Sequence, residues 1–249
     1  TPYVINANVS EGVTLSGIKL IVPQAAKAAY KAAAVWNGFK VVGDAQHIIT
    51  FTQPANGTLL VTNNSTNVLT GTPVDDETVI TINATADTDY QVDSIKAGDQ
   101  VVANGGTFTV TDAVTITAFV SKVKYAITIT APTNGTLVVL NGTDTVRNGD
   151  MIAHGTVLTV TATGNEGYEV DQLKANGTDI VGGSVNVTAA TTITATFKKK
   201  TYAIAITPAV NGTLEVKNGA AVLTGGELIE HGTVLTATAT ANSGYRVDS

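Results

Sequence analysis

At residues 157–163 the chain reads Val157-Leu158-Thr159-Val160-Thr161-Ala162-Thr163, so that apolar residues alternate with threonines. Apolar residues at every second position predict a strand with one face in a core and the other in water. Threonine suits the outer face because its branched side chain fits the pleated surface of a sheet. The same alternation recurs at residues 125–130 and 192–197, which predicts a mainly β, antiparallel fold.

Three copies of one pattern follow one another after about residue 47. Asn-Gly-Thr-Leu occurs at residues 56–59, 134–137 and 211–214, and Tyr-x-Val-Asp occurs at residues 90–93, 168–171 and 245–248, both at intervals of 78 and 77 residues. This period exceeds the roughly 20–50 residues of a solenoid repeat, so each copy is predicted to be a small domain with its own core. Asn-Gly pairs suit the tight turns of hairpins. We expect β domains at residues 48–121, 122–199 and 200–249.

The third copy stops where the second still has two or three strands to come. We expect this end to leave an unpaired sheet edge, which a strand of a neighbouring molecule could complete; otherwise we expect a monomer. The connections at residues 121–124 and 198–201 contain no Gly or Pro, which favours a restrained rod over a flexible tether.

Residues 1–47 follow a different pattern. A short strand is predicted at residues 18–22, ended by Pro23, and a helix at residues 24–37, with Asn37-Gly38 at its C-terminal cap. Apolar residues spaced by three and four along this helix, from Ala26 to Trp36, form one stripe. A strand and a helix cannot close a core alone, so we expect them to pack against protein upstream or against the first β domain.

The composition excludes several classes of function. The net charge is −6 with only 14 Lys and Arg, so no basic surface for nucleic acid is expected. The absence of cysteine excludes disulfides and thiolate metal sites. No apolar run approaches ~18 residues, so we expect no transmembrane segment. The chain begins at Thr1-Pro2-Tyr3 without an initiator methionine or signal peptide, and we take it as a mature product or an excised fragment.

The titratable residues do not predict catalysis. His154 and His231 occupy the same place in two copies, where the first copy has Asp76. A general base would not be repeated along a chain and then dropped from one copy, so these histidines, with His47, are predicted to be polar turn residues. Serine nucleophile motifs are absent.

Two other groups of residues suggest binding more weakly. Asp87, Asp89 and Asp93, with residues 75–77 near them in sequence, provide oxygen ligands of the kind that calcium prefers. The later copies have Asn165-Glu166 and Asn242-Ser243 in this loop, and the glycine and terminal glutamate of an EF-hand are missing, so we expect solvated loop carboxylates and no metal site. Tyr90, Tyr168 and Tyr245 could stack on sugars, but each begins a predicted strand and is interpreted as a core aromatic. The glycine pairs at residues 105–106, 182–183 and 225–226 precede no helix, so no cofactor site is expected.

The N-terminal part resembles the closing unit of BspA-like leucine-rich repeat proteins, a group of bacterial surface proteins. The resemblance rests on residues 17–23, 28–33 and 35–39, which combine a strand, Val-Pro, Ala-Tyr-Lys-Ala, Trp and Phe. It implies that residues 1–47 form a leucine-rich repeat cap (strand plus helix), that a longer leucine-rich domain precedes residue 1, and that Trp36 caps its core.

The three β copies resemble the divergent internalin-type B-repeats, of the Listeria–Bacteroides kind, found in bacterial surface proteins. The resemblance rests on residues 125–130, 134–136, 154–159, 167–170 and 193–197, and the first copy departs from it at Asp76-Glu77 and Asp89-Tyr90. It implies stalk or interaction modules without an active site. A small β-sandwich is our first expectation, with a β-grasp-like sheet as the alternative, although no copy contains a helical pattern.

These observations predict a non-enzymatic, extracellular cell-surface or secreted protein whose β modules act as a stalk for an adhesin-like leucine-rich recognition domain. The alternative is that the modules themselves bind a glycan or a host protein through their repeated loops. Asp93-Ser94-Ile95 and Asp144-Thr145-Val146 resemble the Asp-Ser/Thr-apolar sequon for O-glycosylation in the Bacteroidetes, which implies modification of Ser94 and Thr145. No catalytic, cofactor or metal residue is predicted.

Overall fold

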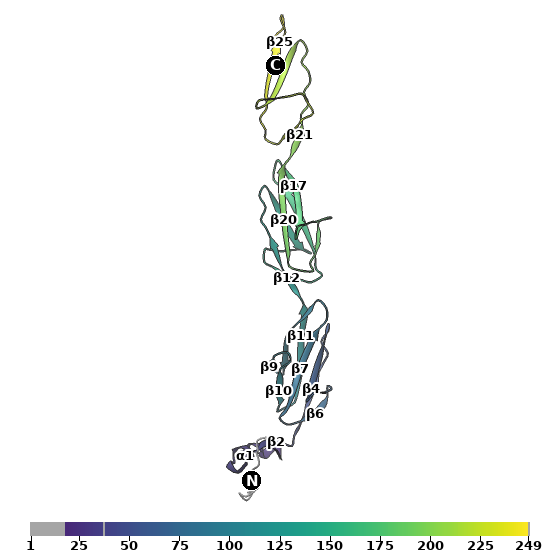
Figure 1. Cartoon of the computed structure of the whole chain (residues 1–249), viewed down its shortest axis with the longest axis vertical. Helices are drawn as coiled ribbons and strands as arrows, with labels where there is room; N and C mark the ends of the chain where they lie inside the picture. Colours follow the sequence, from purple (N-terminus) through teal and green to yellow (C-terminus); the bar gives the residue numbers. More distant parts are fainter. Residues whose placement is uncertain (1–17, 37, 249) are drawn as a thin grey trace. The chain divides into compact units, whose positions relative to one another are not determined.

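The computed structural model describes residues 18–36 and 38–248 and divides the chain into two compact units, Thr1–Val123 and Lys124–Ser249. The first unit holds the N-terminal segment and the first repeat, and the second holds the second and third repeats (Figure 1). Strands make up most of both units, which confirms the predicted mainly β fold. Between residues 44 and 248 the structure has no helix, which a β-grasp would need.

The N-terminal segment contains two parallel strands, β1 (Lys19–Val22) and β2 (Lys40–Gly43), joined by helical turns. The predicted strand at 18–22 is confirmed, but the single helix predicted over 24–37 is wrong. The connection consists of the 3-10 turns η2 (Gln24–Ala26) and η3 (Ala34–Trp36) around one short helix, α1 (Lys27–Ala32). The predicted cap at Asn37, like residues 1–17, lies outside the described residues.

The helix breaks at Ala33, where ψ is 122°. Six residues are too few for a helix to be stable by itself, so tertiary contacts decide where it ends. The break lets Trp36 fold back, 5.7 Å from Tyr30 between ring centroids. Trp36 is 5% exposed and forms a small core with Val22 and Val41.

Two sheets form the first repeat, one in the order β10-β7-β4-β5 and the other in the order β6-β3-β11-β8-β9. Their strands are β3 (Gln46–Phe51), β4 (Gly57–Asn63), β5 (Thr66–Asn67), β6 (Thr72–Asp75), β7 (Thr78–Ala86), β8 (Tyr90–Ala97), β9 (Gln100–Val102), β10 (Thr107–Val110) and β11 (Val114–Lys122). The short strands β5 and β9 form hairpins with β4 and β8, whereas β6 and β10 pair with the non-consecutive strands β3 and β7.

The second repeat has the same strand order, with sheets β15-β12-β20-β17-β18 and β14-β13-β16-β19. Its strands are β12 (Lys124–Ile129), β13 (Gly135–Asn141), β14 (Asp144–Thr145), β15 (Met151–Ala153), β16 (Val157–Gly164), β17 (Tyr168–Ala175), β18 (Thr178–Asp179), β19 (Ser184–Asn186) and β20 (Thr191–Lys199). The sequence repeat is therefore a structural repeat as well.

One strand pair in each of the first two repeats differs from the expected antiparallel pairing. The first and last strands lie side by side and run parallel, β3 with β11 and β12 with β20. Because parallel neighbours point the same way, the chain enters a repeat at one end of this sheet and leaves it at the other.

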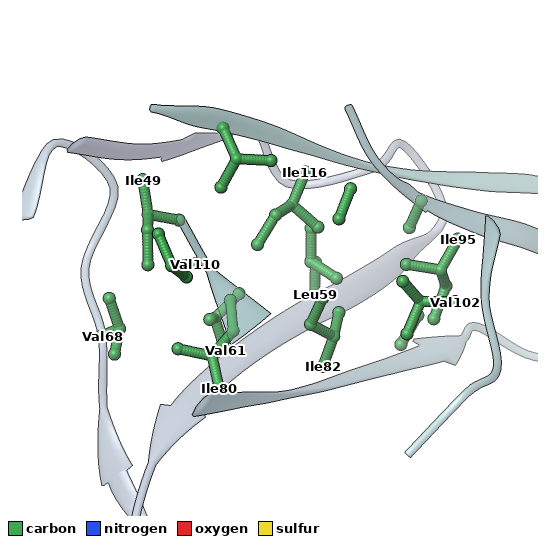
Figure 2. Packing of buried hydrophobic residues seen from close by; sticks show 14 of the residues in the cluster. Ile49, Leu59, Val61, Val68, Ile80, Ile82, Ile95, Val102, Val110 and Ile116 are labelled. Atoms are coloured by element: carbon green, nitrogen blue, oxygen red, sulfur yellow. The ribbon is translucent and has the colours of Figure 1, made fainter. Parts of the chain in front are cut away.

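The core of the first repeat lies between its two sheets. Figure 2 shows Ile49, Ile95 and Ile116 from one sheet pointing toward side chains of the other. The opposite sheet contributes Leu59, Val61, Ile80, Ile82 and Val110 to the same cluster. In the second repeat a separate cluster forms around Ile127, Leu158, Val160 and Ile193. Two sheets enclosing one core is the arrangement expected of a sandwich.

Asn176-Gly177 forms the predicted two-residue turn between β17 and β18, but the Asn-Gly pair at residues 56–57 has a different role. Asn56 has a φ of 63°, so it provides the left-handed residue, and Gly57 then begins β4. A Cβ on Gly57 would lie 2.4 Å from the carbonyl oxygen of Thr85 on the neighbouring strand. Glycine is therefore required there by the close approach of two backbones rather than by a two-residue hairpin turn.

The third repeat retains the first part of this pattern. It consists of β21 (Thr201–Ala203) paired with β24 (Leu228–Glu230), and of β22 (Gly212–Asn218) between β23 (Ala221–Leu223) and β25 (Thr236–Ala241). Among its described residues no strand corresponds to β17 or β20, and Val216 is its one buried apolar residue. Tyr202 and Leu214 are 52% and 37% exposed, whereas the equivalent Tyr125 and Leu137 pack against the core of the second repeat.

Candidate functional site

The most densely connected polar group in the described structure is the two-residue turn Asp76–Glu77 between β6 and β7. Asp76 has a fully buried side chain, although its neighbours in sequence are charged or polar. Its backbone N–H donates to the carbonyl of Ala45, 3.0 Å away, which holds the turn against the start of the repeat. Glu77 has a φ of 58°, a conformation that costs a residue with a Cβ about 1–2 kcal/mol.

The carboxylate of Asp76 joins the first repeat to the N-terminal segment. Its Oδ2 accepts hydrogen bonds from Lys27 Nζ on α1 and from the backbone N–H of Gly43, the latter at 2.8 Å. Its Oδ1 lies 3.1 Å from His47 Nε2 on β3. Glu77 continues the network, with its Oε1 2.9 Å from Lys27 Nζ and in contact with Lys31 Nζ. Both oxygens of Asp76 are therefore engaged.

The electrostatics follow from these contacts. Burial alone would raise the pKa of Asp76, but the hydrogen bonds from Lys27, Gly43 and His47 outweigh it and lower the pKa from 3.8 to about 2. Burial would also raise the pKa of Glu77, but its hydrogen bonds and ion pairs with Lys31 and Lys27 lower it. Burial would lower the pKa of Lys27, but its bonds to Asp76 and Glu77 raise it. Asp76, Glu77 and Lys27 are therefore charged at neutral pH, and together they form a set of ion pairs.

Acid should weaken this site. Because the pKa of Asp76 is lower in the folded protein than in the unfolded chain, its contribution is complete above about pH 4 and is lost as pH falls toward 2. The shift corresponds to about 2 kcal/mol of stability. We expect an acid transition in this window in the fluorescence of Trp36, the only tryptophan. The Asp76→Asn variant should lack this transition, and an unchanged acid curve would contradict the assignment.

The other repeats have different residues at the two equivalent positions. We call positions 76, 154 and 231 the junction positions and positions 47, 125 and 202 the partner positions. The pair is His47 with Asp76 in the first repeat, Tyr125 with His154 in the second, and Tyr202 with His231 in the third. The ring centroids of the two Tyr–His pairs are 6.1 and 6.0 Å apart. His154 and His231 are therefore turn residues as predicted, but the same prediction is wrong for His47, which lies within β3. The sequence interpretation also missed that Asp76 is a buried ion-pair partner.

His231 also contacts the preceding repeat. Its ring covers the buried Gly167, where an added Cβ would lie 2.1 Å from His231 Cδ2. Lys200, between the repeats, donates its N–H to Gly167 and accepts the N–H of His231, each at 2.8 Å. The salt bridge between Lys199 and Glu230, at 3.5 Å, lies beside them.

The variant Gly167→Ala tests this contact. Gly167 has a φ of 78°, so alanine there is strained and also collides with His231. We expect the amide of Lys200 to exchange at least tenfold faster by NMR-detected hydrogen exchange. Gly244→Ala is the matched control, because Gly244 holds the same turn position at a φ of 82° with no neighbour within 4 Å. Equal changes at the Lys200 amide in both variants would assign the effect to something other than His231.

The second and third repeats match a known family. The divergent InlB B-repeat domain matches residues 125–201 and 202–249, which together are half of the chain. The chain belongs to the divergent InlB B-repeat family. Domains of this family are found in bacterial surface proteins. No curated protein and no solved structure showed a significant match.

The first repeat lies outside the matched residues, yet it has the strand order of the matched B-repeat. The resemblance of the N-terminal segment to a leucine-rich repeat unit stays a prediction.

The acidic cluster does not form a ligand set. Among the residues that the structure describes, no three His, Asp or Glu side chains are placed to hold a metal ion. Asp93 is the extra residue where the pairing of β8 with β11 shifts, and Asp171 occupies the same place between β17 and β20. The Oδ1 of Asp93 accepts a hydrogen bond from Ser121 Oγ at 2.9 Å. The repeated Asp of Tyr-x-Val-Asp therefore marks a β-bulge of the B-repeat.

The tyrosines of the same motif are not core residues as interpreted. Tyr90 and Tyr168 are half-buried at the start of β8 and β17, outside the residues of the two core clusters, and Tyr245 is 59% exposed. The polar groove beside β4 and β6, about 460 Å³, is lined by Asn63, Asn64, Asn67 and other small residues without an aromatic side chain. This groove therefore offers no ring on which a sugar could stack.

The two predicted glycosylation sites differ in access. Thr145 is exposed in the hairpin strand β14, whereas Ser94 is half-buried within β8, opposite Phe119. A modifying enzyme needs an exposed hydroxyl, so of the two only Thr145 has a suitable position; modification of either stays a prediction. In the described part of the chain no helix is long and apolar enough to cross a bilayer.

Proposed function

We propose that the chain is a non-enzymatic part of an extracellular or surface protein, in which the B-repeats act as spacers for a recognition domain. The observation that carries this proposal is the parallel pairing of the first and last strands of a repeat. A module that the chain enters at one end and leaves at the other extends a series with each copy added, whereas a module with both ends together would not.

The connection between the second and third repeats supports a spacer role. Lys200 is bonded on both sides through its backbone, to Gly167 and to His231, so it does not act as a free tether. The outer faces of the strands carry threonines, such as Thr159 and Thr161, which are polar and uncharged. The ionisable groups with perturbed pKa values are engaged in structural bonds; Glu227, for example, accepts hydrogen bonds from Thr224 and Gly225 in its own turn.

Small-angle X-ray scattering of the whole chain tests the proposal. A compact globule of this length would have a radius of gyration of about 18 Å. We expect a value well above that, with a maximum dimension that falls when one repeat is deleted in register. A radius near that of a compact globule would overturn the spacer function. Attachment to an adhesin-like leucine-rich domain belongs to the same proposal and is tested by the reading frame upstream of residue 1.

A further inference from the structure

The junction position has the same backbone role in different repeats. The N–H of Asp76 donates to Ala45 at 3.0 Å, and the N–H of His231 donates to Lys200 at 2.8 Å; the two acceptors are equivalent residues, two before the partner position. This bond places the side chain at the junction position next to the segment that precedes the repeat in the chain. Asp76 contacts Gly43 and Lys27, and His231 contacts Gly167.

The residue type at this position matches the surface that it meets. The helical segment before the first repeat presents the amines of Lys27 and Lys31, and the turn that meets it carries two carboxylates. The turn before the third repeat presents Gly167, which has no side chain, and a flat imidazole ring covers it. The partner position changes together with the junction position, from His47 beside Asp76 to Tyr202 beside His231.

Glu77 provides an independent observation. The second and third repeats have Gly155 and Gly232 at the equivalent place, with φ values of 77° and 79° that suit glycine. The first repeat holds a glutamate in nearly the same conformation, at a φ of 58°. A strained residue persists where its surroundings require it, and the surroundings of Glu77 are Lys27 and Lys31.

We propose that the side chain at the junction position, Asp76 or His231, determines which kind of module a repeat accepts on its N-terminal side. The carboxylate of Asp76 selects a segment that presents lysines, and the imidazole of His231 selects a preceding repeat with glycine at position 167. Each of the two residues also disfavours the partner of the other, because a mismatched junction would bury a carboxylate or a lysine without an opposite charge. The inference concerns recognition between modules and holds whether or not the repeats act as a spacer.

Exchanging the two residues in the full chain tests the proposal. In Asp76→His and His231→Asp, each new residue is native at the equivalent position of another repeat, so a simple turn role would tolerate both. We expect Asp76→His to speed exchange of the Gly43 amide at least tenfold, and His231→Asp to do the same for the Lys200 amide, each without effect on the other junction. Gln100→Thr, an exchange between equivalent exposed positions on β9 and β18, is the control and should change neither amide.

The core amides of Ile82 and Val160 report whether a repeat has unfolded. If Asp76→His unfolds the first repeat, the double variant Lys27→Met/Lys31→Met tests the proposal instead. It removes the two lysines of the N-terminal segment that meet Asp76 and Glu77, and it leaves every residue of the repeat unchanged. We expect it to speed exchange at Gly43 at least tenfold, while Lys40→Met, which removes an exposed lysine of β2, does not. Exchange within twofold of the parent chain in His231→Asp, or in the double lysine variant, would overturn the proposal.

Discussion

Replacing Asp76 with alanine is expected to lower the free energy of unfolding of the first unit by about 3 kcal/mol. The variant leaves Lys27, whose side chain is 14% exposed, without its buried carboxylate. It also removes the acceptor of the Gly43 N–H and of His47. Loss of one partner of a buried ion pair is costly because the remaining charge and donors stay desolvated. Urea unfolding followed by Trp36 fluorescence and circular dichroism measures the effect.

Asp75 provides the matched control for this prediction. It is the preceding carboxylate in the chain, it is exposed, and its Oδ1 accepts a hydrogen bond from Gln46 Nε2 at 3.2 Å. Asp75→Ala should therefore change the free energy of unfolding by less than about 0.5 kcal/mol. Similar losses in the two variants would mean that general charge, and not the bonds of Asp76, stabilises the unit.

Replacing Ile82 with alanine is expected to destabilise the first repeat by about 4 kcal/mol. Ile82 on β7 is fully buried in the cluster between the two sheets, where Figure 2 shows it below Leu59. The substitution removes buried carbon atoms and leaves a cavity that the close-packed strands cannot fill. Hydrogen exchange at amides of β4 and β7 measures the loss.

Two comparisons show whether the effect has this cause. Ile48 on β3 is 50% exposed, so Ile48→Ala should cost less than about 1 kcal/mol. The second repeat has its own cluster around Leu158 and Ile193, so its amides should keep their protection in Ile82→Ala. Loss of protection at Val160 together with that of β7 would contradict separate cores.

Much of the fold could be predicted because it depends on local alternation. The strands at residues 157–163 and 192–197 appear in the structure as β16 and β20, since a sheet buries one face and the side-chain period of a strand is two. The repeat spacing also predicted a separate core for each copy, and the first and second repeats each have one. The parallel pairing of β3 with β11 was not predictable in this way, since alternation does not state which strand lies beside which.

The helix at residues 24–37 shows the limit of propensity. Its alanines favour a helix, but the contacts of Trp36 with Tyr30 and Phe39 end it at Ala33. Aromatic packing of this kind outweighs the small differences in helix propensity between residues. The misinterpretation of Tyr90 and Tyr168 has a related cause. The sequence showed that each begins a strand, but it did not show that each ring lies half-buried beside a turn.

The amino-acid sequence by itself determined that this chain is built of β modules in series, because periodicity and repeat spacing are properties of neighbouring residues. Only the tertiary structure decided that Asp76 is a buried partner of Lys27, since these residues lie 49 positions apart. One signal was present in the sequence, namely the joint change of His47 and Asp76 to Tyr125 and His154. It becomes interpretable once folding places the two positions side by side, because burial and pairing of a charge depend on what surrounds it in space.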